Sequence, residues 1–366
     1  MPTVLEKTSA AVAPLPARLL SLDVFRGLTM ASMVMVNNQG SGAYAPLRHA
    51  AWDGITFTDL VFPFFVWIVG VAMTLSMQRR VEQGQDRAAL LGHAARRAAI
   101  IFGIGLFLNA FPEFQLGSLR IPGVLQRIAI CYFLATGIFL YTELRGRVIW
   151  TVGLMLGYFV LMHPGGYLID SNLSDWLDRK LLLGHLYTPT RDPEGTVSTL
   201  TATATCMLGI LTGHLLRARM SEFGRVMAMV GGGGLLLMFG LLLDPVQPIN
   251  KNLWTNTYVL VAGGWAGIVF GIVYWICDVL KAAGRWSQPF VVMGMNAIAV
   301  YIFHGLLGDL FRMIPAGGGN LRQSVFKALS GVLSEPNAWL SYSLIHVGLS
   351  LAFAWFLYRR RWFLRF

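Results

Sequence analysis

The chain has 366 residues, of which 55% are hydrophobic and only 13% are charged, and its mean hydropathy is +0.58. Soluble domains carry about a quarter charged residues, so this composition and its repeated long apolar runs exclude a soluble protein. They indicate a polytopic helical membrane protein with the lipid bilayer as its partner. The formal charge of +11 fits arginine-rich cytoplasmic loops, so we expect no nucleic acid among its partners.

The apolar runs predict one all-α domain. Residues 1–17 contain no basic segment followed by a long apolar core, so we interpret them as a disordered tail and not as a cleaved signal peptide. We expect residues 18–366 to form a single transmembrane domain, because no insert of soluble-domain size interrupts them. About ten spanning helices are predicted, at roughly 20–39, 59–78, 98–114, 121–141, 148–163, 196–215, 226–243, 256–280, 288–311 and 337–358.

The loop charges predict the orientation. With the N-terminus in the cytoplasm, 18 of the 29 lysines and arginines fall in cytoplasmic segments and 9 in the opposite loops. Cytoplasmic loops of membrane proteins carry the excess of positive charge, so we expect both termini to be cytoplasmic. The loop that contains His49 and the loops at 164–195 and 244–255 are then at the outer face.

The polar loop between the first two apolar runs carries the first candidate site. Asn38 closes the first helix, Asp59 opens the second, and His49 lies between them. A neutral imidazole can accept a proton from an attacking amine, a carboxylate can fix its tautomer, and an amide can stabilise charge on a carbonyl oxygen. We therefore predict that these three residues are catalytic. The plainer alternatives are a loop histidine and an N-cap aspartate, although two carboxylate oxygens can serve both roles.

Further polar residues are predicted to line the outer half of the bundle and bind the substrate. Arg127 lies about six residues into the fourth helix, roughly 9 Å deep, from where snorkelling to the headgroups is the alternative. Trp52 and Asp53, from the loop that contains His49, belong to this group. Helix caps and interhelical hydrogen bonds are the alternatives for its remaining members, Glu194, Ser198, Lys251, Asn252 and Asn296.

Basic residues near the inner face are candidates for a phosphorylated ligand. Asp23 and Arg26 are three residues apart on one face of the first helix, which suits an intrahelical pair or a contact with a phosphate. Arg79 and Arg80 follow the second helix. The histidines show no metal-ligand spacing, and the three cysteines lie in apolar runs as packing residues, so we expect no metal site.

Six stretches of the chain closely resemble one family of membrane enzymes, the heparan-α-glucosaminide N-acetyltransferases. They are RLLSLDVFRGLTMASMVMVNN (18–38), HAAWDGITFTDLVFPFFVWIVG (49–70), GVLQRIAICYF (123–133), DPEGTVST (192–199), NKNLWT (250–255) and GMNAIAVY (294–301). The second block is highly specific, whereas LDVFRG is shared more loosely with other membrane acyltransferases.

The resemblance implies a multi-pass acetyltransferase of the bacterial inner membrane. It implies that an acetyl group passes from cytosolic acetyl-CoA, the co-substrate, to an amino sugar or glycan outside. The family's catalytic histidine and its active-site asparagine and aspartate fall on His49, Asn38 and Asp59. The resemblance also makes a homodimer an expectation.

We expect the donor to enter the bundle from the cytoplasmic face, with Asp23, Arg26, Arg79 and Arg80 near its phosphates. His49 is then a general base or a transient acyl carrier, and the sequence leaves both routes open. The alternative of a different class is a transporter or flippase that moves an unmodified sugar-like solute through the same polar cavity.

Overall fold

The computed structural model describes residues 19–364, so the predicted tail at 1–17 lies outside the described residues. Besides helices, the described residues contain one pair of short antiparallel strands, β1 (Pro315–Ala316) and β2 (Gly319–Asn320). A π-helical turn, Trp275–Val279, continues α9. The α-helices are α1 (Leu20–Val36), α2 (Phe57–Glu82), α3 (Arg87–Ala110), α4 (Val124–Tyr141), α5 (Leu144–Met162), α6 (Leu173–Leu182), α7 (Ser198–Arg217), α8 (Glu222–Leu242), α9 (Asn256–Tyr274), α10 (Gln288–Met295), α11 (Ala297–Met313), α12 (Leu321–Ser330) and α13 (Glu335–Arg359).

The predicted all-α polytopic fold is confirmed, since every predicted apolar run coincides with a helix or a pair of helices. Within the described residues, eight helices are long and apolar enough to cross a membrane, and the bent pair α10–α11 makes a ninth if it forms one span. With 17 residues, α1 is one residue shorter than α4, the shortest of these eight helices. The number of ten spans and the cytoplasmic termini stay predictions.

The run at 288–311 was expected to form one helix, and this is wrong. It forms α10 and α11, whose axes differ by 79°. The break is at Asn296, where φ is −121° and ψ is 33°, and its side-chain oxygen accepts a hydrogen bond from the backbone of Leu364. Asparagine readily exchanges helical hydrogen bonds for such contacts, which hydropathy does not register.

Glycines let the helices that carry the polar residues approach each other at backbone distance. A Cβ atom at Gly27 of α1 or Gly294 of α10 would lie 1.8 or 2.1 Å from a carbonyl oxygen of the facing helix. At Gly70 of α2 and Gly209 of α7 the distance would be 2.0 Å in both cases. Small residues at such crossings are typical of membrane helix packing, and here they fix α1 and α2 against their neighbours.

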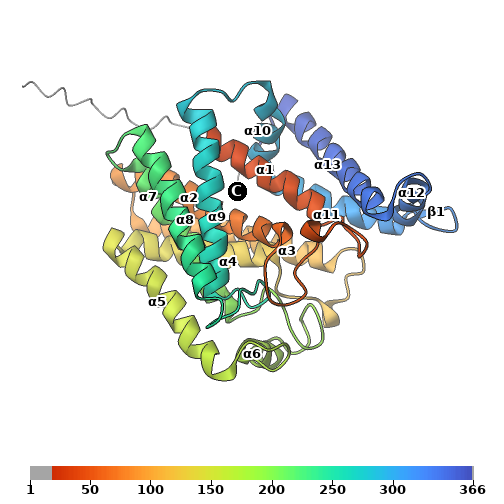
Figure 1. Cartoon of the computed structure of the whole chain (residues 1–366), viewed down its shortest axis with the longest axis horizontal. Coiled ribbons are helices and arrows are strands. Elements are labelled where there is room, and N and C mark those ends of the chain that lie inside the picture. The colour runs from red at the N-terminus through yellow and green to blue at the C-terminus, as the bar shows by residue number, and fades with distance from the viewer. Residues whose placement is uncertain (1–18, 365–366) are drawn as a thin grey trace, which may run out of the picture.

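The loops after α1, α5 and α8 meet at one end of the bundle, while the short helices α6 and α12 lie at its periphery (Figure 1). The backbone amide of Gly54 donates a 2.7 Å hydrogen bond to Ile249, and the Trp52 indole donates a 3.0 Å bond to the carbonyl of Tyr167. Three segments that are distant in the sequence are therefore joined around His49.

Candidate active site

His49 and Asp59 form the central pair of this end of the molecule. Nδ1 of His49 lies 2.6 Å from Oδ1 of Asp59, whose side chain is almost fully buried. Since a carboxylate only accepts hydrogen bonds, Nδ1 carries the proton and Nε2 keeps its lone pair. No residue between 19 and 364 hydrogen-bonds to Nε2, and half of the His49 side chain is exposed. The geometry suits proton acceptance from an incoming group.

The second oxygen of Asp59 holds the loop and the start of α2 together. Oδ2 accepts hydrogen bonds from the backbone amides of Ala50 at 3.1 Å and Thr56 at 3.0 Å, and from the Thr56 hydroxyl at 3.0 Å. The Thr56 contacts belong to the N-terminal cap of α2. Asp59 therefore makes both kinds of contact expected of it, one with each oxygen, and the cap fixes where His49 can lie.

Lys251 brings a positive charge to this pair from the loop before α9. Its Nζ lies 3.4 Å from Nδ1 of His49. Because the proton on Nδ1 already points to Asp59, we interpret this approach as a charge contact. Burial lowers the pKa of the Lys251 ammonium below its usual 10.5, although Glu194 and Asp59 oppose that change.

The neighbouring predicted residues connect the loops. Asp53 accepts a 3.0 Å hydrogen bond from the side chain of Asn250, and Trp52 lies beneath the guanidinium of Arg191 at 5.4 Å. Asn252, next to Lys251, is half-buried, and no described residue hydrogen-bonds to its side chain. The structure thus brings all three to the rim of the site, and two of them join its loops.

Glu194 belongs to an ion-pair network that sequence reasoning identified only in part. Arg120 binds Asp192 through two hydrogen bonds of 2.7 and 2.9 Å and also contacts Glu194. Its guanidinium stacks on Tyr187 at 4.7 Å. Although burial opposes it, Asp192 and Glu194 raise the pKa of Arg120, so this cation stays charged. The network rigidifies the loop before α7 next to Lys251.

Arg127 and Ser198, both predicted to bind substrate, contact each other. Nη2 of Arg127 donates to the Ser198 hydroxyl and, at 2.9 Å, to the carbonyl of Gly195. The guanidinium is fully buried and lies 5.0 Å from the ring of Trp254, so it does not snorkel to the headgroups. Its Nε and Nη1 have no described protein partner. The observed contacts fasten α4 to the start of α7 beneath the site.

The observed contacts of Asn38, which is predicted to stabilise a carbonyl oxygen, are with residues other than His49 and Asp59. Its Nδ2 donates to the carbonyl of Val34 at 2.8 Å and lies 3.4 Å from Nδ1 of His304. Both amide hydrogens therefore have partners on α1 and α11. Asn38 caps α1 from within the same turn and holds His304, which the sequence reasoning did not single out.

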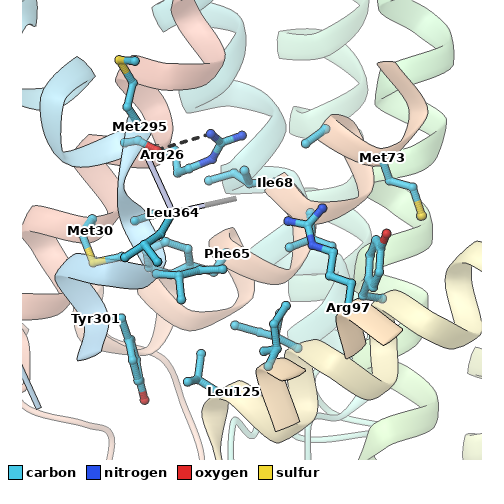
Figure 2. Close-up of a pocket in the computed structure, with 18 of the residues that line it drawn as sticks. Arg26, Met30, Phe65, Ile68, Met73, Arg97, Leu125, Met295, Tyr301 and Leu364 are labelled. Carbon is cyan, nitrogen blue, oxygen red and sulfur yellow. Dashed lines mark hydrogen bonds between the residues drawn. The ribbon is translucent and has the colours of Figure 1, made fainter. Parts of the chain in front are cut away.

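A cavity of about 520 Å³ extends through the bundle from the end at which α1 begins. Methionine, phenylalanine and isoleucine side chains form much of its wall, including Met30, Phe65 and Ile68 (Figure 2). Such a volume is typical of a small-molecule site. Tyr301 of α11 lines the cavity together with Val124, which begins α4 after the loop that contains Arg120.

Three arginines from three helices line the part of this cavity near the start of α1: Arg26, Arg80 and Arg97. Arg26 is 3.4 Å from Asp23, the only carboxylate among the lining residues, and Arg97 lies over the ring of Tyr132 at 5.2 Å. Figure 2 shows Arg26 and Arg97 entering the space from different helices. The excess of positive charge at this end of the cavity favours an anionic ligand.

Arg79 is the fourth residue predicted to bind the donor. It is exposed and does not line the cavity.

Asn296 lies at the bend between α10 and α11. Leu364, from the segment after α13, donates a backbone hydrogen bond to Asn296 and lines the cavity together with Phe363.

Within the described residues, no three His, Cys, Asp or Glu side chains are grouped closely enough to hold a metal ion.

Comparison with known proteins identifies the family of this chain. A family model described as heparan-alpha-glucosaminide N-acetyltransferase, catalytic, matches residues 18–232. The chain belongs to this family. The heparan-alpha-glucosaminide N-acetyltransferases of Homo sapiens and Mus musculus are 32% and 31% identical to it, over alignments that cover 82% and 80% of the chain. The alignments cover 54% of each relative, so the chain spans about half the length of the curated relatives it matches.

The match to the heparan-alpha-glucosaminide N-acetyltransferase model includes the His49–Asp59 pair and Glu194, whereas Lys251 lies beyond its last residue. Sequence reasoning missed Arg97 and Tyr301. Arg97 resembled an ordinary cytoplasmic-loop charge, and Tyr301 an ordinary interfacial aromatic. Only the helix packing reveals that both face the same cavity.

Proposed function

We propose that this chain is a transmembrane acetyltransferase, which carries an acetyl group from cytosolic acetyl-CoA to the amine of a sugar at the outer face. Membership of the family supports this reaction class. The carrying observation is the cavity itself. It has guanidinium groups at one end, an apolar wall along its length, and Tyr301 together with Val124, the first residue of α4, at the other.

The cavity chemistry matches the parts of the donor. Arg26, Arg80 and Arg97 would face the phosphates, since guanidinium groups bind phosphate oxygens in a planar, two-bonded geometry. The slim pantetheine arm would follow the apolar wall, and the thioester would lie towards Tyr301. The acceptor would approach from the outer loops and present its nitrogen to His49.

The chemistry of His49 follows from its free Nε2. An amine is protonated at neutral pH and has no lone pair for attack until it loses a proton. Nε2 can accept that proton, while Asp59 stabilises the resulting imidazolium and keeps it oriented; such proton transfer contributes about 10²–10⁴-fold to the rate. The amine nitrogen then bonds to the acyl carbon, the C–S bond breaks, and CoA leaves as the thiol with a proton from that nitrogen.

A covalent route uses the same atoms. Nε2 would attack the thioester carbon, the C–S bond would break, and CoA would leave as the thiolate, which takes one proton from the amine. The amine would then displace the imidazole from the acetyl carbon, and the released Nε2 would accept the second proton of the amine. Acetylated protein trapped from labelled acetyl-CoA in the absence of acceptor distinguishes this route from direct transfer.

The test is transport-coupled acetylation in proteoliposomes. Labelled acetyl-CoA is supplied at the face that carries Arg80 and glucosamine at the face that carries His49. We expect N-acetylglucosamine to form, and His49→Ala to abolish it while CoA affinity stays within twofold. His163→Ala is the matched control, because His163 is exposed in another outer loop. Movement of unmodified glucosamine without acetylation would instead support the transporter alternative, and undiminished turnover by His49→Ala would refute the role of this histidine.

A further inference from the structure

A second cavity, of about 600 Å³, lies beside the inner end of the first. Met295 and Phe363 line both cavities, so the two are separated by little more than these side chains. The remaining wall comes from Leu20 at the start of α1, from α10 and from the end of α13. Figure 1 shows α10 between the start of α1 and the end of α13, and α10 packs against both helices. The residues that line the second cavity come from these three elements and from the segment after α13.

The lining of this second cavity differs from that of the first. Arg359 and Arg361 supply two guanidinium groups, and Tyr358 supplies an exposed aromatic ring. No carboxylate lines it, whereas Asp23 accompanies Arg26 in the first cavity. Neither Arg359 nor Arg361 forms an ion pair with any residue in the described range 19–364. Two unpaired arginines beside an aromatic ring suit a ligand with both a phosphate and a planar base.

The size of the proposed donor also suits a ligand that occupies both cavities. Acetyl-CoA consists of a slim pantetheine arm, a diphosphate, and a bulky adenosine that carries a further phosphate. The first cavity offers a long apolar wall for the arm and three arginines for the diphosphate, but no additional basic group for the nucleotide end. The second cavity supplies that group, and it shares Met295 and Phe363 with the first.

We propose that the second cavity binds the nucleotide end of the acyl donor, with Arg359 and Arg361 on its ribose phosphate and Tyr358 against its base. This inference rests on the proposed function, because it names a second part of the same donor site. If the nucleotide binds here, the end of α13 and the turn after it contribute to specificity, because they favour an acyl-CoA over a smaller acyl thioester.

The experiment compares two ligands that share the arm and differ in the nucleotide. The affinities of CoA and of pantetheine are measured for the full chain in nanodiscs of neutral phosphatidylcholine, so that anionic headgroups do not compete. The double variant Arg359→Gln/Arg361→Gln should lose about tenfold or more in affinity for CoA and stay within twofold for pantetheine. Arg360→Gln is the matched control: Arg360 lies between the two, does not line the cavity and faces the ring of Phe356.

The outcomes separate the two proposals. If the wild-type chain fails to bind CoA, the proposed function fails. If it binds CoA and the double variant binds equally well, or if both ligands lose affinity in parallel, the nucleotide site is overturned and the proposed function stands. If the double variant only loses retention of an anionic lipid in mixed nanodiscs, the cavity holds a lipid headgroup and the inference is wrong.

Discussion

The ammonium of Lys251 lies 3.4 Å from Nδ1 of His49, although 202 residues separate them in the chain. A cation in that position can stabilise negative charge that develops on an acyl oxygen beside His49. Lys251→Met should therefore lower kcat by about 10²-fold. Lys180→Met, at an exposed position in α6, should leave kcat unchanged. Equal turnover by Lys251→Met and wild type would contradict this role.

The two oxygens of Asp59 allow its structural and chemical roles to be separated. Asp59→Asn keeps an oxygen that accepts from the Thr56 amide but removes the anion beside His49. We expect kcat to fall by about 10²–10⁴-fold, with little change in melting temperature. Asp59→Ala should lose the cap as well and cost about 1 kcal/mol of stability. Parallel losses of activity and stability in Asp59→Asn would show that the residue acts only on the fold.

Arg80 and Arg79 are adjacent and equally basic, yet only Arg80 lines the cavity. Arg80→Gln should weaken CoA binding by about tenfold, since a charge-assisted contact with phosphate is lost. Arg79→Gln should leave the affinity unchanged. Isothermal titration of both variants measures the difference, and equal losses would show that only the general positive charge of this face matters.

The predicted orientation can be tested at two exposed positions, with little background because all three native cysteines are buried. A cysteine in place of Leu168, which is 74% exposed in the loop before α6, should react with an impermeant maleimide on intact cells. A cysteine in place of Gln85, between α2 and α3, should react only after permeabilisation. The reverse pattern would place His49 in the cytoplasm.

The outer helix α6 should carry a pH-dependent stability. Burial raises the pKa of Asp178 above its usual 3.8, against the hydrogen bonds from Thr196. The native state therefore holds this proton more tightly than the unfolded chain. The resulting stabilisation is present below about pH 3.8 and is lost as the pH rises through the higher folded pKa. Relative to Asp178→Asn, wild type should lose melting temperature as the pH rises from about 4.

Asp170 offers a control of opposite sign. A hydrogen bond with Thr190 and the nearby Arg191 lower its pKa, so its contribution is lost as the pH falls. Relative to Asp170→Asn, wild type should therefore lose melting temperature on acidification. Identical slopes for the two variants would show that other groups dominate the pH response.

The helices were predictable because long apolar runs are the direct signature of membrane spans. The residues at which these helices begin and end were less predictable. The chain extends α2 to Glu82 and begins α3 at Arg87, in charged segments that hydropathy assigns to loops. The bend at Asn296 depends on one backbone conformation, which leaves no trace in an apolar average.

The candidate site likewise contains some contacts that local sequence predicts and others that it does not. His49 and Asp59 are ten residues apart around one short loop, so their meeting followed from local sequence. Asn38 was grouped with them by proximity, yet the direction of its amide is set by the packing of α1 against α11. The approach of Lys251 and the position of Arg97 depend on tertiary packing, and neither carries a local signal.

The joining of three loops also constrains how the protein is made. Helices are synthesised in chain order, so the loop that carries His49 is complete long before Asn250 and Lys251 leave the ribosome. Until the segment between α8 and α9 is in place, Asp53 lacks its hydrogen bond to Asn250 and Gly54 lacks its bond to Ile249. We therefore predict that a substitution which delays insertion of α8 or α9 lowers activity, although it changes no residue of the candidate site.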